Sequence, residues 1–324
     1  MIVPFYRRHT VVNILALIVK ILDVLFSMWH DKLISISSDG ENNMIGRHGG
    51  LVTLLEKEAT NNIMCVCCVS HQMDIVIKKV TKVMMDGLFY KIAHAFSVHL
   101  RAHLNLITEM DGAKCPKNTT RWVAFGKMLK WFLHHRCRLL QYIEEKQPIQ
   151  APSPAWWILC VVVAPFFEMM QVTFAKLQCQ DLVMSQQMAE IKVFVSNICI
   201  DISICHDSMD TSYNELNQNT YIKFDEWWMT TASIKGHIDD QGSWARDMFN
   251  ALSAKDQDAT IHNIVIFSIT MVNELCQVQA KWDSNNEAAM TKASLVMPAQ
   301  LVHLRPRDVI RNILNPRCAH LSRF

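Results

Sequence analysis

The chain has 324 residues, which suggests two domains or one domain with a large insertion, because a single core seldom grows past about 250–300 residues. Half of the residues are hydrophobic, and 9 Gly and 9 Pro are too few for a loop-rich or all-β fold, so the composition favours a helix-dominated protein. The net charge of +2 excludes any argument about partners from overall charge, and 11 cysteines, an odd number, fit reduced thiols better than a secreted disulfide scaffold.

The apolar segment near the N-terminus imitates a signal peptide or a membrane span but has the periodicity of a helix that packs on a core. Lys20 and Asp23 interrupt it, and no small-residue cleavage site follows it. Its apolar residues recur at helical spacing: Ile14, Leu17, Ile18, Ile21, Leu22 and Leu25. We therefore expect an amphipathic helix over about 10–28.

A second apolar run, at 155–167, is too short to cross a bilayer core of about 30 Å and contains Pro165. The two runs together predict a protein that is neither secreted nor embedded in a membrane. We expect it in the nucleus or the cytoplasm.

The first third of the chain predicts an α/β module. A β-branched run at 32–38 is typical of a strand, and a helix is expected through residues 51–59. A second buried strand is expected at 62–70 and a helix directly after it. The order strand–helix–strand–helix indicates an α/β core, and a further helix is expected to end near Asp111.

Strand signals fade after the polar connector at 113–120. Helical periodicity then dominates, and the segments expected to be helical are 121–146, about 156–200, about 222–256 and 258–282. Loops are expected at 147–154 and 207–220. The pairs Trp156–Trp157 and Trp227–Trp228 are interpreted as core anchors of these helices.

Asp39 is the strongest single candidate for chemistry. A carboxylate at the C-terminal end of a core strand lies at the sheet edge where α/β proteins place ligands, and grouped carboxylates there hold Mg²⁺ for phosphoryl transfer. The alternative is an ordinary helix N-cap, which the local pattern alone favours.

The segment CVCCVSHQMD at 65–74 looks like a zinc site but lacks the second pair of ligands that a closed site needs. Alternate strand positions point to opposite faces, so buried thiols explain these cysteines better. Cys68 and His71 follow the second strand, and His71 is expected at the same sheet edge as Asp39.

The segment 112–143 contains no Asp or Glu. Wound as a helix, it has an apolar stripe of Trp122, Phe125, Leu129, Phe132, Leu133 and Leu140. The opposite stripe carries Lys127, Lys130, His134 and Arg138, with Trp131 on the same side and Lys117 and Arg121 just upstream. Such a face suits a phosphate backbone and an unstacked base; the alternative is a solvated face of an ordinary helix.

The order of four segments resembles hAT-superfamily DNA transposases, most closely the transposase-like proteins of oomycetes. LISISSDGENNMIGRHGGLVTLLE matches the segment around that family's second catalytic aspartate, which maps to Asp39. CCVSHQMDIV matches its C-x-x-H motif at Cys68 and His71, and KNTTRW matches a block whose tryptophan maps to Trp122. The fourth segment, from Arg121 to Pro148, is similar to the start of the family's helical insertion.

The resemblance implies an incomplete RNase H-like α/β core over 1–113, an all-α insertion domain over 114–300 and the start of a return to the core over 301–324. It also implies Mg²⁺-dependent phosphodiester chemistry by an acid triad, in which Asp39 is a metal ligand. The first aspartate and the final glutamate of that triad are not found in this sequence. We therefore expect a transposase-derived protein that binds no Mg²⁺ tightly, does not cleave DNA alone and retains weak, non-specific DNA binding. The family's dimerisation segment is not found either, so the oligomeric state stays open. The alternatives are a competent Mg²⁺-dependent nuclease and a helical protein-interaction module.

Overall fold

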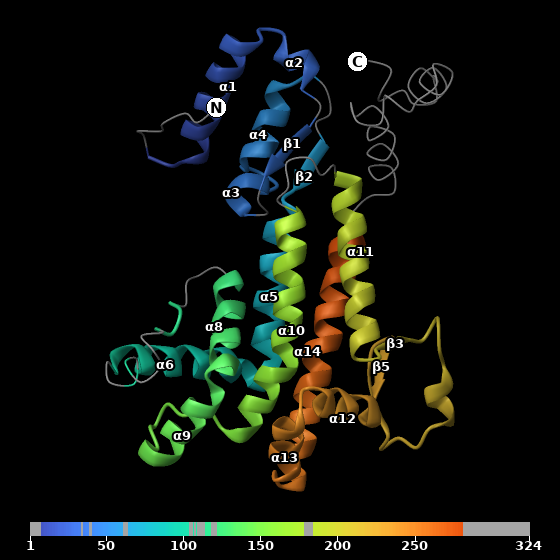
Figure 1. The fold of residues 1–324 in the computed structure, drawn as a ribbon. Helices are drawn as coiled ribbons and strands as arrows, with labels where there is room; N and C mark the ends of the chain where they lie inside the picture. Colours follow the sequence, from blue (N-terminus) through green and yellow to red (C-terminus); the bar gives the residue numbers. More distant parts are fainter. Residues whose placement is uncertain are drawn as a thin grey trace, which may run out of the picture. The chain divides into compact units, whose positions relative to one another are not determined.

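The structure is a computed structural model that describes residues 8–33, 35–38, 41–60, 64–103, 106, 108, 114–117, 122–177 and 184–280. The described part is dominated by helices (Figure 1). Its contacts divide the chain into two compact units, Met1–Ile75 and Val76–Phe324. The division falls inside helix α5 (Val69–Val83), earlier than the domain boundary expected at 113, which stays a prediction.

The first unit contains a β–α–β arrangement, as the sequence predicts. Strands β1 (Ser35–Ser38) and β2 (Met64–Cys67) pair in parallel, with Ser38 opposite Cys67. Helices α3 (Asn42–Ile45) and α4 (Leu51–Glu58) lie between them in the chain. A parallel pair needs such a crossover connection, because a tight turn cannot reverse the chain twice.

Helix α1 (Val11–Leu25) forms where predicted, and Thr10 caps it by accepting from the backbone N–H of Asn13. Its apolar residues pack on a small core built around Trp29 and Leu55; they are Leu15, Ile18, Val19 and Leu22. Trp29 belongs to the short helix α2 (Trp29–Lys32), and its indole N–H donates to Asp23 at 2.8 Å. Asp23, one of the residues that interrupt the apolar run, therefore fixes the side chain at the centre of this core.

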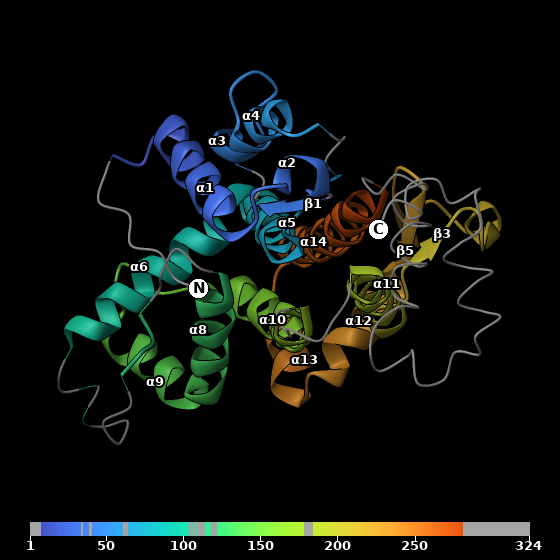
Figure 2. The same ribbon diagram turned by 90° about the horizontal axis from the view of Figure 1, so that it is seen from above.

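Three long helices form the centre of the second unit. They are α10 (Pro154–Leu177), α11 (Met184–Asp201) and α14 (Ala254–Ala280), which pack on one another and run side by side in both views (Figures 1 and 2). Every residue from Trp156 to Ala164 is buried, so this part of α10 is apolar on all sides. The helices around them are α6 (Leu88–Ala102), α8 (Trp122–His134), α9 (Arg136–Lys146), α12 (Thr231–Asp240) and α13 (Ser243–Asn250).

The prediction that the region after 114 is all-helical is wrong. Three short antiparallel strands form a sheet in the order β3–β5–β4, with bounds Cys205–His206, Trp227–Thr230 and Tyr221–Phe224. Asp225 adopts a positive φ of 53° at the turn between β4 and β5, a conformation that Asp tolerates better than most residues. Trp228 is buried as predicted, but it lies on a strand and not on a helix.

Two described helices, Pro154–Leu177 and Ala254–Ala280, are long and apolar enough to cross a membrane by length and composition alone. The apolar run at 155–167 is thus part of a longer helix than expected. Most of the apolar window of each helix, 67% and 56%, is buried inside the protein, as in a core helix of a soluble protein. Length and composition are therefore weak evidence for a membrane span.

The turn between α5 and α6 is held by a side chain from α14. Met85, Asp86 and Gly87, in the 3₁₀ turn Met84–Gly87, all adopt left-handed backbone conformations, and the backbone N–H of Met85 donates to Asn263 Oδ1 at 2.6 Å. We expect Asn263→Ala to lower the free energy of unfolding by about 1–2 kcal/mol, because it leaves a partly buried N–H without an acceptor. Urea denaturation measures this. Asn263→Asp keeps the acceptor oxygen and should recover most of the loss; an equal loss in both variants would contradict the role of the acceptor.

Candidate nucleic-acid interface

Helix α8 has one buried face and one exposed face, as its periodicity predicts. Phe125, Leu129 and Phe132 are fully buried, and Met128 joins them. Gly126 lies on the same side, where an added Cβ would approach Phe167 Cβ to 3.0 Å. The absence of a side chain at Gly126 therefore lets α8 pack closely on α10, and this packing fixes which face of α8 meets water.

The exposed side of α8 carries the basic face, by which we mean Lys127, Lys130 and His134. The three side chains recur at positions i, i+3 and i+7, so the rigid helix holds them in one row. No Asp or Glu occurs in the described segments 114–117 and 122–143. Such a row of cations follows a phosphate backbone without reading its sequence.

An acid from a neighbouring helix reduces the charge of this row. Lys130 Nζ lies 2.9 Å from Glu168 Oε1 on α10, with 68% and 50% of the two side chains exposed. The segment is thus free of acids in sequence but not in space. Because the pair is exposed, solvent screens it, and we expect it to compete only weakly with a phosphate.

The predicted single helix over 121–146 is two helices, and this changes the place of Arg138. Helix α8 ends at His134 and α9 begins at Arg136, so helical periodicity no longer aligns Arg138 with the basic face. Arg138 is half-buried, and its Nη1 donates to Gln141 Oε1 at 2.9 Å within α9. Arg136 instead places its guanidinium 4.9 Å from the ring centre of Trp244.

Trp131 is less available for stacking on a base than predicted. It is half-buried, and its ring centre lies 4.6 Å from that of His135 and 5.9 Å from that of Phe132. Its Nε1 atom is buried and has no hydrogen-bond partner among the described residues. Lys117 is exposed in the described connector, whereas Arg121 lies outside the described residues, as does the side chain of Trp122.

The candidate catalytic residues lie at the end of the parallel strand pair in the first unit. The backbone N–H of Cys68 donates to Ser38 O at 2.8 Å, which joins the C-terminal ends of β1 and β2. Cys68 is a half-buried free thiol, and His71 is half-buried in the first turn of α5. Asp39, which follows β1 directly in the chain, lies outside the described residues.

Among the described residues, no group of three or more His, Cys, Asp or Glu side chains is arranged to hold a metal ion. The described residues therefore do not supply the donor set that Mg²⁺ needs, since it is held by several oxygen ligands. We route no step through that ion.

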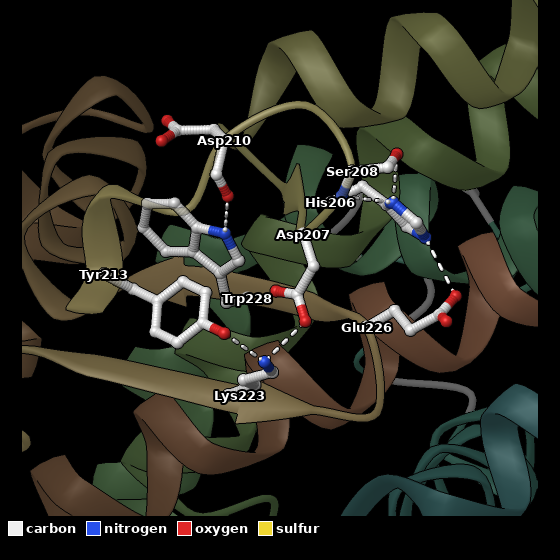
Figure 3. A network of polar contacts seen from close by, with 8 residues as sticks. All are labelled: His206, Asp207, Ser208, Asp210, Tyr213, Lys223, Glu226 and Trp228. Carbon is white, nitrogen blue, oxygen red and sulfur yellow. Dashed lines mark hydrogen bonds and ion pairs between the residues drawn. The ribbon is translucent and has the colours of Figure 1, made fainter.

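A polar network that the sequence did not predict holds the 207–220 loop to the small sheet (Figure 3). Lys223 Nζ on β4 donates to Asp207 Oδ2 at 2.5 Å and to Tyr213 Oη at 2.6 Å, and these bonds raise the pKa of Lys223. Trp228 Nε1 donates to Asp210 O at 3.0 Å. The aromatic run YIKF before Asp225 was the signal for a strand at this place.

The second half of the network lies at the turn after β3. His206 Nδ1 accepts from the backbone N–H of Ser208 at 3.1 Å and lies 2.7 Å from Ser208 Oγ, so the proton of the neutral ring is on Nε2. Nε2 lies 3.2 Å from Glu226 Oε2. Because His206 and Ser208 belong to one turn and Glu226 to the next hairpin, these bonds fasten the turn to the hairpin (Figure 3).

Comparison of the chain with models of known families, with curated proteins and with solved structures finds no match.

Proposed function

We propose that the second unit binds the phosphate backbone of nucleic acids, weakly and without sequence preference, through the basic face of α8. The observation that carries this proposal is the row of exposed Lys127, Lys130 and His134 on the side of α8 opposite its buried face. Phosphate contacts supply essentially all of the affinity of non-specific complexes, so the proposal needs no base-reading residue. DNA is the expected partner because the sequence resembles DNA transposases.

Salt dependence tests this proposal directly. Neutralising each phosphate releases counterions, so the logarithm of the binding constant falls with the logarithm of salt concentration by about 0.9 per contact on duplex DNA. Two to three contacts from the basic face predict a slope of about −2 to −3 in a fluorescence-anisotropy titration with a labelled duplex. Binding that does not change with salt, or no binding at low salt, would leave a protein-interaction role as the better account of α8.

We further propose that the first unit descends from the RNase H-like core of a hAT-type transposase and is catalytically silent in this chain. The parallel pair β1–β2, with its crossover helices and with Cys68 and His71 just after β2, supports this lineage. A single carboxylate holds Mg²⁺ poorly, because the ion keeps its waters unless several ligands replace them.

We expect no Mg²⁺-dependent nicking of supercoiled plasmid by the full chain, and no difference between the wild type and Asp39→Ala. The control is Asp86→Ala, which removes an exposed carboxylate outside the candidate site. Nicking that requires Mg²⁺ and is lost in Asp39→Ala but kept in Asp86→Ala would show a competent nuclease instead.

A further inference from the structure

Three side chains from two helices converge in the second unit, away from the basic face. His99 and His103 stand one helical turn apart at the end of α6, and their ring centres are 4.2 Å apart. Tyr142 reaches them from α9, with its hydroxyl oxygen 2.9 Å from His99 Nε2. Its ring centre lies 6.1 Å from that of His99 and 6.2 Å from that of His103.

Two histidines at positions i and i+4 of a helix share one face and can ligate the same ion. Metal–imidazole bonds of about 2.0–2.1 Å place two neighbouring ligand nitrogens roughly 3 Å apart. Imidazole rings whose centres are 4.2 Å apart reach that separation by small side-chain rotations. His103 is exposed and His99 is half-buried, so an ion can enter from solvent.

We propose that His99 and His103 form a two-histidine site for a divalent transition-metal ion of the imidazole-binding class, such as Ni²⁺ or Zn²⁺. Imidazole nitrogen suits these ions, whereas Mg²⁺ and Ca²⁺ prefer oxygen ligands. No third His, Cys, Asp or Glu completes the group among the described residues, so water or an added ligand fills the other positions and the ion exchanges readily.

Tyr142 is a positioning residue for this site. When its hydroxyl oxygen accepts the Nε2–H of His99, the other ring nitrogen, Nδ1, carries the lone pair that binds the metal. Ligating histidines commonly donate their second nitrogen in this way, and loss of such a partner typically weakens metal binding about 10–100-fold. The same bond ties α9 to α6, so the ion and the helix pair stabilise each other.

The test is isothermal titration of the full chain with Ni²⁺ alone, in a Cys137→Ser background that removes the exposed thiol on α9. We expect His103→Gln and His99→Gln each to weaken binding by at least about tenfold, because one imidazole remains. Tyr142→Phe keeps both ligands and should weaken binding by about tenfold. The matched control is His94→Gln, an exposed histidine on the same helix, which should leave the affinity unchanged.

A thermal-unfolding readout separates a metal site from a purely structural cluster. Saturating Ni²⁺ should raise the Tm of the parent chain and of His94→Gln, and it should raise that of His103→Gln much less, because an ion that binds only the folded state stabilises it. Since His103 is exposed, its replacement should leave the metal-free Tm nearly unchanged. Equal Ni²⁺ affinity in the parent and His103→Gln, or binding lost in His94→Gln instead, would overturn the proposal.

Discussion

Replacing Trp156 by alanine is expected to lower the free energy of unfolding of the second unit by about 3–5 kcal/mol. Trp156 is fully buried on α10, and its indole N–H donates to Phe89 O on α6 at 3.0 Å. Its ring stacks on Phe89 at 5.2 Å and meets Phe132 of α8 edge-on at 5.9 Å. One side chain thus joins three helices, and alanine would leave a cavity at their meeting point. Chemical denaturation followed by circular dichroism measures the loss.

Two companion variants make this expectation specific. Trp156→Phe keeps an aromatic ring but removes the indole donor, so a smaller loss of about 1–3 kcal/mol is expected from the vacated volume and the missing bond. Ile149→Ala removes an apolar side chain that is 98% exposed and should change stability by less than about 0.5 kcal/mol. Equal losses for Trp156→Ala and Ile149→Ala would show that α10 does not organise the unit as described.

The double substitution Lys127→Gln/Lys130→Gln is expected to weaken binding to duplex DNA by about fiftyfold near 0.1 M salt. This figure follows from the counterion slope, since about 0.9 per phosphate between 1 M and 0.1 M corresponds to roughly eightfold per contact. The slope against salt should become shallower by about two contacts. Both side chains are exposed, so the fold should survive their replacement. Anisotropy titrations at several salt concentrations measure both quantities.

Lys192→Gln/Lys235→Gln is the matched control, because it removes the same charge from exposed positions on α11 and α12. It should leave the slope unchanged and weaken binding only slightly. Glu168→Gln tests the opposite direction: it frees Lys130 from its ion pair and should strengthen binding by a few fold. If the control weakens binding as much as the double substitution, the affinity comes from diffuse charge and not from α8.

Local periodicity was sufficient to predict most helices and the two parallel strands. Thr10 and the spacing after it predict α1, and the β-branched run ending at Ser38 predicts β1. The run after Asn62 predicts β2 and α5 in turn. These elements depend on the sequence within a few residues, because they bury one face or one stripe.

The errors arose where a local pattern was ambiguous. The segment 221–230 is rich in aromatic and β-branched residues, but helical segments on both sides made a helix the expected continuation. The positive φ of Asp225 permits a tight hairpin instead. The break at His135 has no Gly or Pro to announce it, and it separates Arg138 from the basic face.

The candidate sites show the same limit. The sequence placed Lys127 and Lys130 on one face of α8 correctly, because i and i+3 positions share a side. It could not show that Glu168, 38 residues further on, reaches Lys130, since that depends on how α8 packs on α10. The pairing of His99 with Tyr142 is equally non-local.

The apolar circumference of α10 also sets how the second unit loses its structure. A helix with one wet face can fray alone, but α10 has no such face between Trp156 and Ala164. It can enter water only when α8, α11 and α14 separate from it together. Pro165 adds no amide proton at its centre, yet the amides around it are shielded by three neighbours, so they should be the last to exchange with deuterium and should report global opening of this unit.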